Sequence, residues 1–299
     1  RLTFTSQGRA AFTRASSPFL PLVARADLDA ALAQAAVDAG AVLRTGTAVT
    51  AYEEQDGVVT LSTSGGPVRA RTVVGADGST SRAAAYVGVD CEQVDLGLEA
   101  EVPRPAGSDW DGRVLLDWGP VPGSYGWVFP KGDVLTVGVI GDRAAGGALR
   151  AYYREFRARH GVAGPALQDG GHLTRVRAPG SPLRRGRVLV AGDAAGLLDP
   201  WTREGISHAL RSGALAGEAA LGDVGAYESR VAARLGPEIT AGRAALAAFG
   251  RHPSAVHAVL RALPGVWPLF VRLVAGETSL DEQLARRRVR AGVRLLARA

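Results

Sequence analysis

The feature that most constrains this chain is the segment from Arg187 to Gly213, in which a short apolar run leads into Gly192-Asp193. The run predicts a buried strand that ends at a glycine, where backbone can approach a ligand closely. Asp193 offers a carboxylate that can accept hydrogen bonds from sugar-alcohol hydroxyls. After Pro200 a helix begins near Gly205-Ile206, and its N-terminal amides and dipole favour an anion or an electron-rich carbonyl. This order of elements favours a ligand site over an ordinary strand–turn–helix with a solvated aspartate.

A second segment repeats the design earlier in the chain. Val73 to Gly75 predicts a strand end, and Asp77-Gly78 follows it before a helix start near Arg82. Taken alone, this pattern is equally typical of a turn that is capped by an aspartate. Beside the first segment, it leads us to expect that both pairs of Asp and Gly line one cleft.

Arg25 stands at the entry of a predicted helix. Its guanidinium could bind diphosphate oxygens in a bidentate manner, although an arginine at such a position is as often a surface residue. The helix is expected from Arg25 to Gly40, with Asp27 as a cap and with Leu28, Leu32 and Ala36 on one face.

Short strands with turn residues between them are predicted on both sides of this helix. The N-terminal strands are expected at Arg1–Ser6, Phe19–Val23, Ala41–Arg44, Ala48–Glu53 and Val68–Val74, with tight turns at Asp56-Gly57 and Gly65-Gly66. The middle of the chain predicts a mostly antiparallel sheet from Leu96–Val102, Val114–Trp118, Trp127–Phe129 and Val134–Ile140. A helix at Gly147–His160 and a strand at His172–Arg177 follow. From Glu204 onward we expect helices, broken at Gly222, Pro237, Pro253, Pro264 and Pro268.

Several classes of protein are disfavoured by composition. The formal charge is +6, but 34 of the 35 basic residues are arginines and they are scattered, so no nucleic-acid surface is expected. The single cysteine, Cys91, permits neither an internal disulfide nor a cysteine zinc cluster, and the histidines show no metal-ligand spacing. No apolar run reaches the ~18 residues of a membrane span. We expect a cytoplasmic protein without a bound metal.

The motifs together resemble the FAD-binding motifs of the hydroxylase-like flavoprotein superfamily. Gly75-Ala76-Asp77-Gly78 is similar to its Asp-Gly motif, and Gly192-Asp193-Ala194-Ala195 to its Gly-Asp motif. Within that superfamily, the run from Tyr125 to Lys131, followed by Val137-Gly138, resembles the signature of the geranylgeranyl reductases. The run from Asp199 to Ile206 fits the same family.

The resemblance implies FAD as cofactor and a role for each candidate residue. Arg25 would contact the diphosphate or ribityl region, Asp77 and Gly78 would lie near the diphosphate, and Asp193, after Gly192, would hold the ribityl hydroxyls. Pro200 would lead to Gly205 and Ile206, whose amides would meet the flavin pyrimidine edge. The aromatic residues of the signature would line the substrate cavity, although residues at alternate strand positions often belong to a sheet core; they are Tyr125, Trp127 and Phe129.

The expected fold class is α/β, with an FAD-binding domain, an antiparallel-sheet substrate domain and a helical C-terminal region. The FAD-binding domain would comprise residues 23–90 and 172–225, the substrate domain 1–22 and 91–171, and the helical region 226–299. The family opens with a Gly-rich βαβ unit that this sequence lacks, and the sequence contains no methionine. We therefore expect that about 100 residues precede Arg1, enough for two or three supersecondary units.

The resemblance implies reduction of isolated C=C bonds in an isoprenoid chain, either a geranylgeranyl group or the side chain of a menaquinone. NAD(P)H is the expected electron source, with a ferredoxin-like donor as the alternative, and no residue is identified as the proton donor. An FAD-dependent aromatic hydroxylase and a truncated, non-catalytic relative are the competing interpretations.

The C-terminal stretch Asp281 to Ala299 places six arginines among apolar residues. The arginines are Arg286, Arg287, Arg288, Arg290, Arg294 and Arg298. The pattern is typical of a solvated helix or of a basic amphipathic helix on an anionic membrane surface. A lipid substrate favours the second, which would place the protein at the inner face of the membrane.

Overall fold

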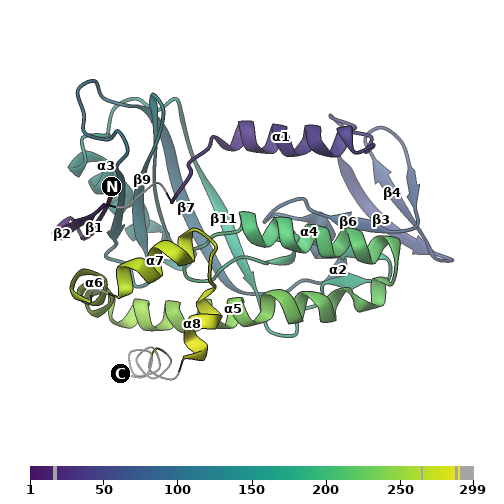
Figure 1. Ribbon diagram of the computed structural model, residues 1–299. Coiled ribbons are helices and arrows are strands. Elements are labelled where there is room, and N and C mark those ends of the chain that lie inside the picture. Colours follow the sequence, from purple (N-terminus) through teal and green to yellow (C-terminus); the bar gives the residue numbers. More distant parts are fainter. Residues whose placement is uncertain (16–18, 264, 287–288, 290–299) are drawn as a thin grey trace.

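A computed structural model describes residues 1–15, 19–263, 265–286 and 289. A seven-stranded sheet stands at one end of an elongated molecule, and two small sheets lie toward the other end (Figure 1). The strand order of the seven-stranded sheet is β11-β7-β10-β9-β8-β1-β2, and every neighbouring pair in it is antiparallel except β1 and β8. The strands are β1 Leu2–Ser6, β2 Arg9–Arg14, β7 Cys91–Pro103, β8 Val114–Trp118, β9 Tyr125–Lys131, β10 Val134–Asp142 and β11 Gln168–Arg177.

The two faces of the large sheet differ because side chains alternate along each strand. On one face Val128, Leu135 and Val137 form a core with helix α3, Gly146–Arg159, which contributes Leu149 in contact with the sheet and the buried ring of Phe156. On the other face β9 presents Tyr125, Trp127 and Phe129, which lie opposite Ile140, Gly138 and Thr136 of β10. We call this second face the aromatic face.

Two three-stranded sheets complete the β structure. The first has the order β12-β13-β6, with β12 Arg184–Arg185, β13 Val188–Val190 and β6 Val73–Gly75. Its strands β13 and β6 run parallel. The second is an antiparallel meander of β3 Val49–Gln55, β4 Val58–Thr63 and β5 Val68–Ala70.

Long helices connect the two ends of the molecule. Helices α4, Ile206–Leu221, and α5, Tyr227–Arg251, run side by side, and α1, Arg25–Asp38, lies above α4 in Figure 1. The core between the helices and the small sheets includes Val190, Leu197 and Tyr227, whose hydroxyl donates to the Val190 carbonyl at 2.7 Å. The remaining helices are α2 Arg82–Val87, α6 Pro253–Ala262, α7 Val266–Val274 and α8 Leu280–Ala285, with short 3-10 turns η1 Arg143–Ala145, η2 Gly192–Ala195 and η3 Val224–Ala226.

Several predicted strands are wrong. Phe19–Val23 and Ala41–Arg44 form no strand, because no neighbouring strand pairs with them despite their β-forming residues. Val68–Val74 splits into β5 and β6, which belong to different sheets. The boundary expected at residue 172 falls within β11, which pairs with β7 over its full length. The division of the chain into domains stays a prediction.

The helix predictions need two corrections. Asp27 does not cap α1, because the helix begins two residues earlier and its N-cap, Ala24, has no side-chain oxygen. Pro237 lies inside α5 and Pro268 inside α7, so neither breaks its helix. Pro268 is in the first turn of α7, where a backbone N–H has no partner within the helix. The expected break at Pro264 lies outside the described residues.

Among the described residues no single helix is long and apolar enough to cross a membrane. Helices α6 and α7 meet the length and composition criteria only as a pair that is bent by 104°.

Candidate functional site

The two Gly-Asp segments lie at the ends of neighbouring parallel strands. Val73 pairs with Val188 and Gly75 with Val190, so that β6 and β13 end side by side. The Ala191 N–H donates to the Gly75 carbonyl at 3.0 Å. Ligands of α/β sheets bind outside the carboxyl ends of the strands, and this edge is such a position.

A direct contact joins the two turns. The Ser79 hydroxyl, one residue after Gly78, donates to Asp193 Oδ2 at 3.4 Å. A carboxylate has about four acceptor positions, so one long hydrogen bond leaves Asp193 with capacity for further donors. Asp193 is only partly buried and can therefore accept them from a ligand.

Close packing fixes the start of α4 against the end of β13. Gly192 has φ of 57°, its N–H donates to Ser212 Oγ at 2.9 Å, and a Cβ there would come within 3.0 Å of Ala209. Gly205 caps α4, and a Cβ at this position would come within 2.9 Å of Asp193 Oδ1. The glycines therefore bring the helix N-terminus next to the carboxylate.

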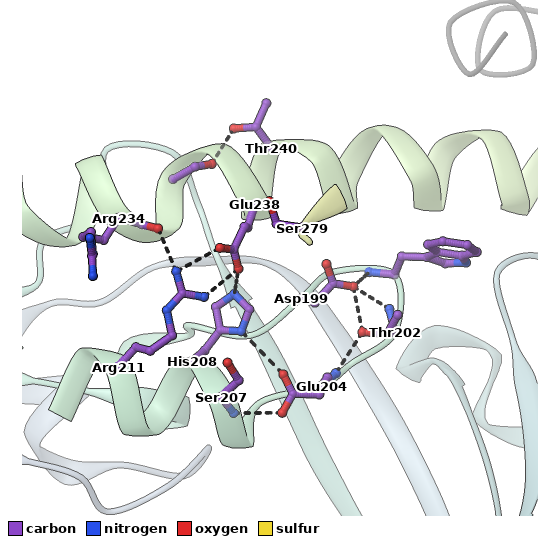
Figure 2. A network of polar contacts seen from close by, with 12 residues as sticks. Asp199, Thr202, Glu204, Ser207, His208, Arg211, Arg234, Glu238, Thr240 and Ser279 are labelled. Carbon is purple, nitrogen blue, oxygen red and sulfur yellow. Dashed lines mark hydrogen bonds and ion pairs between the residues drawn. The ribbon is translucent and has the colours of Figure 1, made fainter. Parts of the chain in front are cut away.

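The N-terminus of α4 already attracts an anion. The Ser207 N–H donates to Glu204 Oε1 at 2.8 Å (Figure 2). Burial raises the pKa of Glu204, but His208 and the backbone amides of Ser207 and Ile206 outweigh burial and lower it. Glu204 is not among the site residues predicted from the sequence, although its place directly before Gly205-Ile206 was a usable signal. A ligand at the Ile206 amide would compete with this carboxylate.

Glu204 belongs to a network that joins α4 to α5. The buried His208 places Nδ1 3.8 Å from Glu204 Oε2 and Nε2 3.9 Å from Glu238 Oε2. Arg211 binds both Glu238 oxygens at 2.8 Å (Figure 2). The network fixes the direction in which the N-terminus of α4 points.

The loop before α4 is held to the aromatic face. Asp199 Oδ1 accepts hydrogen bonds from the Trp201 and Thr202 amides at 3.0 and 2.6 Å. The buried Pro200 accepts a hydrogen bond from Gln93 Nε2 of β7 at 3.0 Å. Pro200 therefore lies between the large sheet and the small sheet whose strands lead into the two Gly-Asp segments.

Arg203 anchors the same loop. Its guanidinium binds both Asp95 oxygens, at 3.2 and 3.1 Å, and donates to the Gly123 carbonyl at 2.9 Å. Its backbone is left-handed, with φ of 58°, which is uncommon for a residue other than glycine. No local sequence signal distinguishes this arginine from the others, so its role was not predicted from the sequence.

The aromatic residues of β9 form a continuous row. The ring centroids of Tyr125 and Trp127 are 5.8 Å apart, and those of Trp127 and Phe129 are 6.2 Å apart. The Tyr125 hydroxyl donates to the Thr202 carbonyl, and burial raises its pKa to about 12. Tyr125 and Phe129 also pack against a core cluster that contains Trp118 and Phe249. A place in the sheet core is the alternative role that the sequence left open for them. Their substrate-binding role stays a prediction.

The remaining candidates have structural partners. Asp77 accepts hydrogen bonds from Ser81 Oγ and from the Arg82 and Ala83 amides at 2.8 and 3.3 Å, so its carboxylate holds the first turn of α2. Gly78 follows it with φ of 75°.

Arg25 is exposed and pairs with Asp29 on its own helix at 3.1 Å. The N-terminal ends of α1 and α4 both point toward the large sheet (Figure 1). Within the described part of the chain, no group of three or more His, Cys, Asp or Glu residues could hold a metal ion.

Comparison with known proteins identifies relatives of this chain. No protein-family model matches the chain. Over 214 residues the chain is 30% identical to digeranylgeranylglycerophospholipid reductase 2 of Methanosphaera stadtmanae, a match that covers 66% of this chain and 53% of the relative. The chain is also similar to the digeranylgeranylglycerophospholipid reductase of Methanocaldococcus jannaschii, with 31% identity over 169 residues, 51% of this chain and 41% of that relative. The resemblance to geranylgeranyl reductases is thereby confirmed. The chain spans about half the length of the curated relatives it matches.

Solved structures confirm the predicted α/β fold class. The chain matches a geranylgeranyl bacteriochlorophyll reductase-like protein from Thermoplasma acidophilum with a TM-score of 0.71 and 19% identity, over 99% of this chain and 82% of that one. It also matches an anhydrotetracycline hydroxylase from Streptomyces rimosus with a TM-score of 0.58 and 21% identity, over 85% and 57% of the two chains. Reductase-like proteins and hydroxylases therefore share this fold.

The donor and acceptor groups of this candidate site fit a flavin nucleotide. Asp193 retains acceptor capacity for hydroxyl groups, and the N-terminus of α4 favours a negatively charged ring edge. No heavy atom lies within 4 Å of a Cβ built at Gly78, apart from its chain neighbours, so a ligand could approach the backbone there.

Proposed function

We propose that this chain is part of an FAD-dependent oxidoreductase that reduces C=C bonds in an isoprenoid chain, such as a geranylgeranyl group or a menaquinone side chain. The observation that carries the proposal is the contact between Ser79 and Asp193, which brings the two Gly-Asp turns together beside the start of α4. The homology to digeranylgeranylglycerophospholipid reductases supports the substrate class.

The proposed flavin site has an acceptor end and a donor end. Asp193, directly after Gly192, would accept hydrogen bonds from the ribityl hydroxyls. Gly205 and Ile206 would donate their amides to the pyrimidine edge, beside the buried Pro200. Glu204 would have to leave the Ile206 amide when this edge binds, since the two acceptors compete for one donor.

The diphosphate would lie nearer to Gly78 and Arg25. Asp77 is committed to α2, so we assign to it the shape of the turn and not a direct contact with a phosphate of like charge. Arg25 would have to exchange Asp29 for the diphosphate, which costs little because exposed ion pairs contribute about 0–1 kcal/mol.

The substrate would lie along the aromatic face, next to Tyr125, Trp127 and Phe129. When bound, reduced FAD would supply the hydride, and NAD(P)H would supply the electrons that reduce it. A lipid substrate also implies contact with a membrane surface, for which residues 281–299 are the proposed segment. Residues 281–285 of this segment belong to α8, and apart from Arg286 and Val289 the rest of it lies outside the described residues.

An FAD-dependent hydroxylase is the second candidate, because an anhydrotetracycline hydroxylase has the same fold. The mass of the product separates the two reactions. The full-length protein would be purified, its absorption spectrum would test for bound flavin, and it would be incubated with a geranylgeranyl lipid and a chemical reductant. A mass gain of two hydrogens per bond supports the reductase, whereas a gain of one oxygen supports the hydroxylase. Absence of flavin from the full-length protein would contradict both and support a non-catalytic relative.

A further inference from the structure

Reduction of an unactivated alkene requires a proton as well as a hydride, and the aromatic face carries a group that can supply it. Trp127, Gly138 and Glu99 lie directly opposite one another on β9, β10 and β7. Residues that are opposite in adjacent strands point to the same face of the sheet. Glu99 therefore lies on the aromatic face. Strand β10, which carries Gly138, separates it from Trp127 on β9.

Gly138 allows the indole to reach this carboxyl group. A Cβ at Gly138 would collide with three ring atoms of Trp127, so the indole lies across the glycine. The indole therefore extends from β9 across β10 toward Glu99, and it lies close enough to lower the pKa of that carboxyl group. His172 of β11 covers the neighbouring Gly97 in the same way, with a ring atom 2.9 Å from a Cβ built there. Two rings therefore flank Glu99.

The surroundings of Glu99 favour its protonated form. Burial raises the pKa of this carboxyl group and the Glu101 carboxylate raises it further, while His172, Lys131 and the Trp127 indole partly oppose the shift. On the side of β11 the residue opposite is Gly170, where a Cβ would meet no heavy atom within 4 Å. No side chain of that residue separates Glu99 from an incoming molecule.

Tyr125 is the other acidic group of the row, and it is less suited to give a proton. Its hydroxyl already donates to the Thr202 carbonyl, and its pKa of about 12 makes it a weak acid. Glu99 is the stronger acid and lies next to the tryptophan at the centre of the row.

We propose that Glu99 is the catalytic acid that protonates the isoprenoid double bond. The inference rests on the proposed function. The π electrons of the alkene form a C–H bond to the carboxylic-acid proton of Glu99, and the O–H bond electrons stay on Glu99 as a carboxylate. Reduced flavin, when bound, would supply the hydride for the second C–H bond, which would leave the flavin oxidised and the alkene saturated. Solvent then returns a proton to Glu99.

The test compares Glu99→Gln with Glu101→Gln, a matched change two residues along the same strand and on the same face. Glu101 pairs with Lys131 at 3.8 Å and acts on Glu99 only through its charge, so its removal should lower the pKa of Glu99 without removing the acid. In the full-length protein, Glu99→Gln should lower turnover of a geranylgeranyl lipid by about 10²–10⁴-fold, the usual contribution of a positioned general acid. Turnover by wild type and Glu101→Gln should fall as pH rises through the pKa of Glu99. In Glu99→Gln, turnover should no longer fall over this pH range, and this is the expected signature of the acid.

A second readout requires no turnover. Because the Trp127 indole lies beside Glu99 on the same face, its fluorescence in flavin-stripped protein should change as Glu99 titrates. The transition should persist in Glu101→Gln and vanish in both Glu99→Gln and Trp127→Phe. Equal turnover and an equal pH profile in Glu99→Gln and wild type would overturn the assignment. If wild type reduces no isoprenoid but the fluorescence transition depends on Glu99, the proposed function fails, and with it the catalytic role.

Discussion

Arg203 and Asp95 form a bidentate ion pair in which each side chain is only 3% exposed. The pair joins two parts of the chain that are 108 residues apart, the loop before α4 and strand β7. The loop carries Pro200 and leads into Gly205, while β7 carries Glu99. The ion pair therefore sets the distance between the proposed flavin site and the aromatic face.

Loss of one partner should destabilise the protein strongly. Arg203→Gln leaves a buried carboxylate without its cation, a change that costs about 3–5 kcal/mol. The free energy of unfolding, measured by urea denaturation of the full-length protein, should fall by this amount. The double variant Arg203→Gln with Asp95→Asn should recover part of it, because the isolated charge is gone. Arg25→Gln removes an exposed pair with Asp29 and is the control, with an expected change of about 0–1 kcal/mol. Equal losses for Arg203→Gln and Arg25→Gln would contradict a buried role.

The flavin site is tested by Asp193→Ala. The ribityl hydroxyls would lose a charged acceptor that is worth about 1.5–3 kcal/mol, which corresponds to about one to two decades in affinity. The ratio of FAD to protein after purification measures the effect. Asp38→Ala, which removes an exposed carboxylate of α1, is the control. Equal occupancy in both variants would exclude Asp193 from the site.

The sequence predicted the segments that local residues determine. The run into Gly192-Asp193, the strand Val114–Trp118 and the turn at Asp56-Gly57 all follow from nearby glycines and apolar residues. Partners that are distant in sequence could not be predicted in this way. The pairing of Arg203 with Asp95 has no local signature, and neither has the proximity of Trp127 and Glu99.

The strand predictions failed for the same reason. Val42 and Leu43 have β-forming side chains, yet they are 83% and 62% exposed and pair with no strand. A strand depends on its neighbour, which a propensity cannot supply. By contrast, the position of α1 was predicted, although its cap was not, because a helix makes its hydrogen bonds within itself.

Trp127 is expected to act on the substrate and not on the flavin. Trp127→Ala should raise KM for a geranylgeranyl lipid or change the number of bonds reduced, while bound FAD stays constant. Loss of a large buried aromatic side chain costs about 3–5 kcal/mol at most. Val128→Ala, on the opposite face of the same strand, should lower stability without changing KM. Loss of flavin from Trp127→Ala would place Trp127 in a structural role.

His160 should make stability depend on pH. Burial lowers its pKa from the ordinary 6.5 to about 4, and its ring packs edge-on against Phe156 with centroids 4.7 Å apart. The unfolded chain binds a proton at His160 more readily than the folded chain does. The stability that the buried, neutral imidazole contributes is therefore fully present above pH 6.5 and is lost as pH falls toward 4. His160→Phe should flatten this part of the stability profile. Urea denaturation between pH 4 and 7 measures it, and parallel curves for wild type and variant would refute the assignment.

The C-terminal arginines yield a prediction about lipid access. Each basic residue near an anionic membrane gains about 1 kcal/mol, and salt weakens this attraction. Insertion of the apolar residues among them would add a contribution that is less sensitive to salt. The full-length protein should therefore sediment with anionic vesicles, less so at high salt, and deletion of residues 281–299 should reduce the bound fraction. Replacement of Arg287, Arg288 and Arg290 by Gln should reproduce most of the loss at low salt and little at high salt. If the intact and deleted proteins sediment alike, the segment is a solvated helix and the substrate reaches the aromatic face by another route.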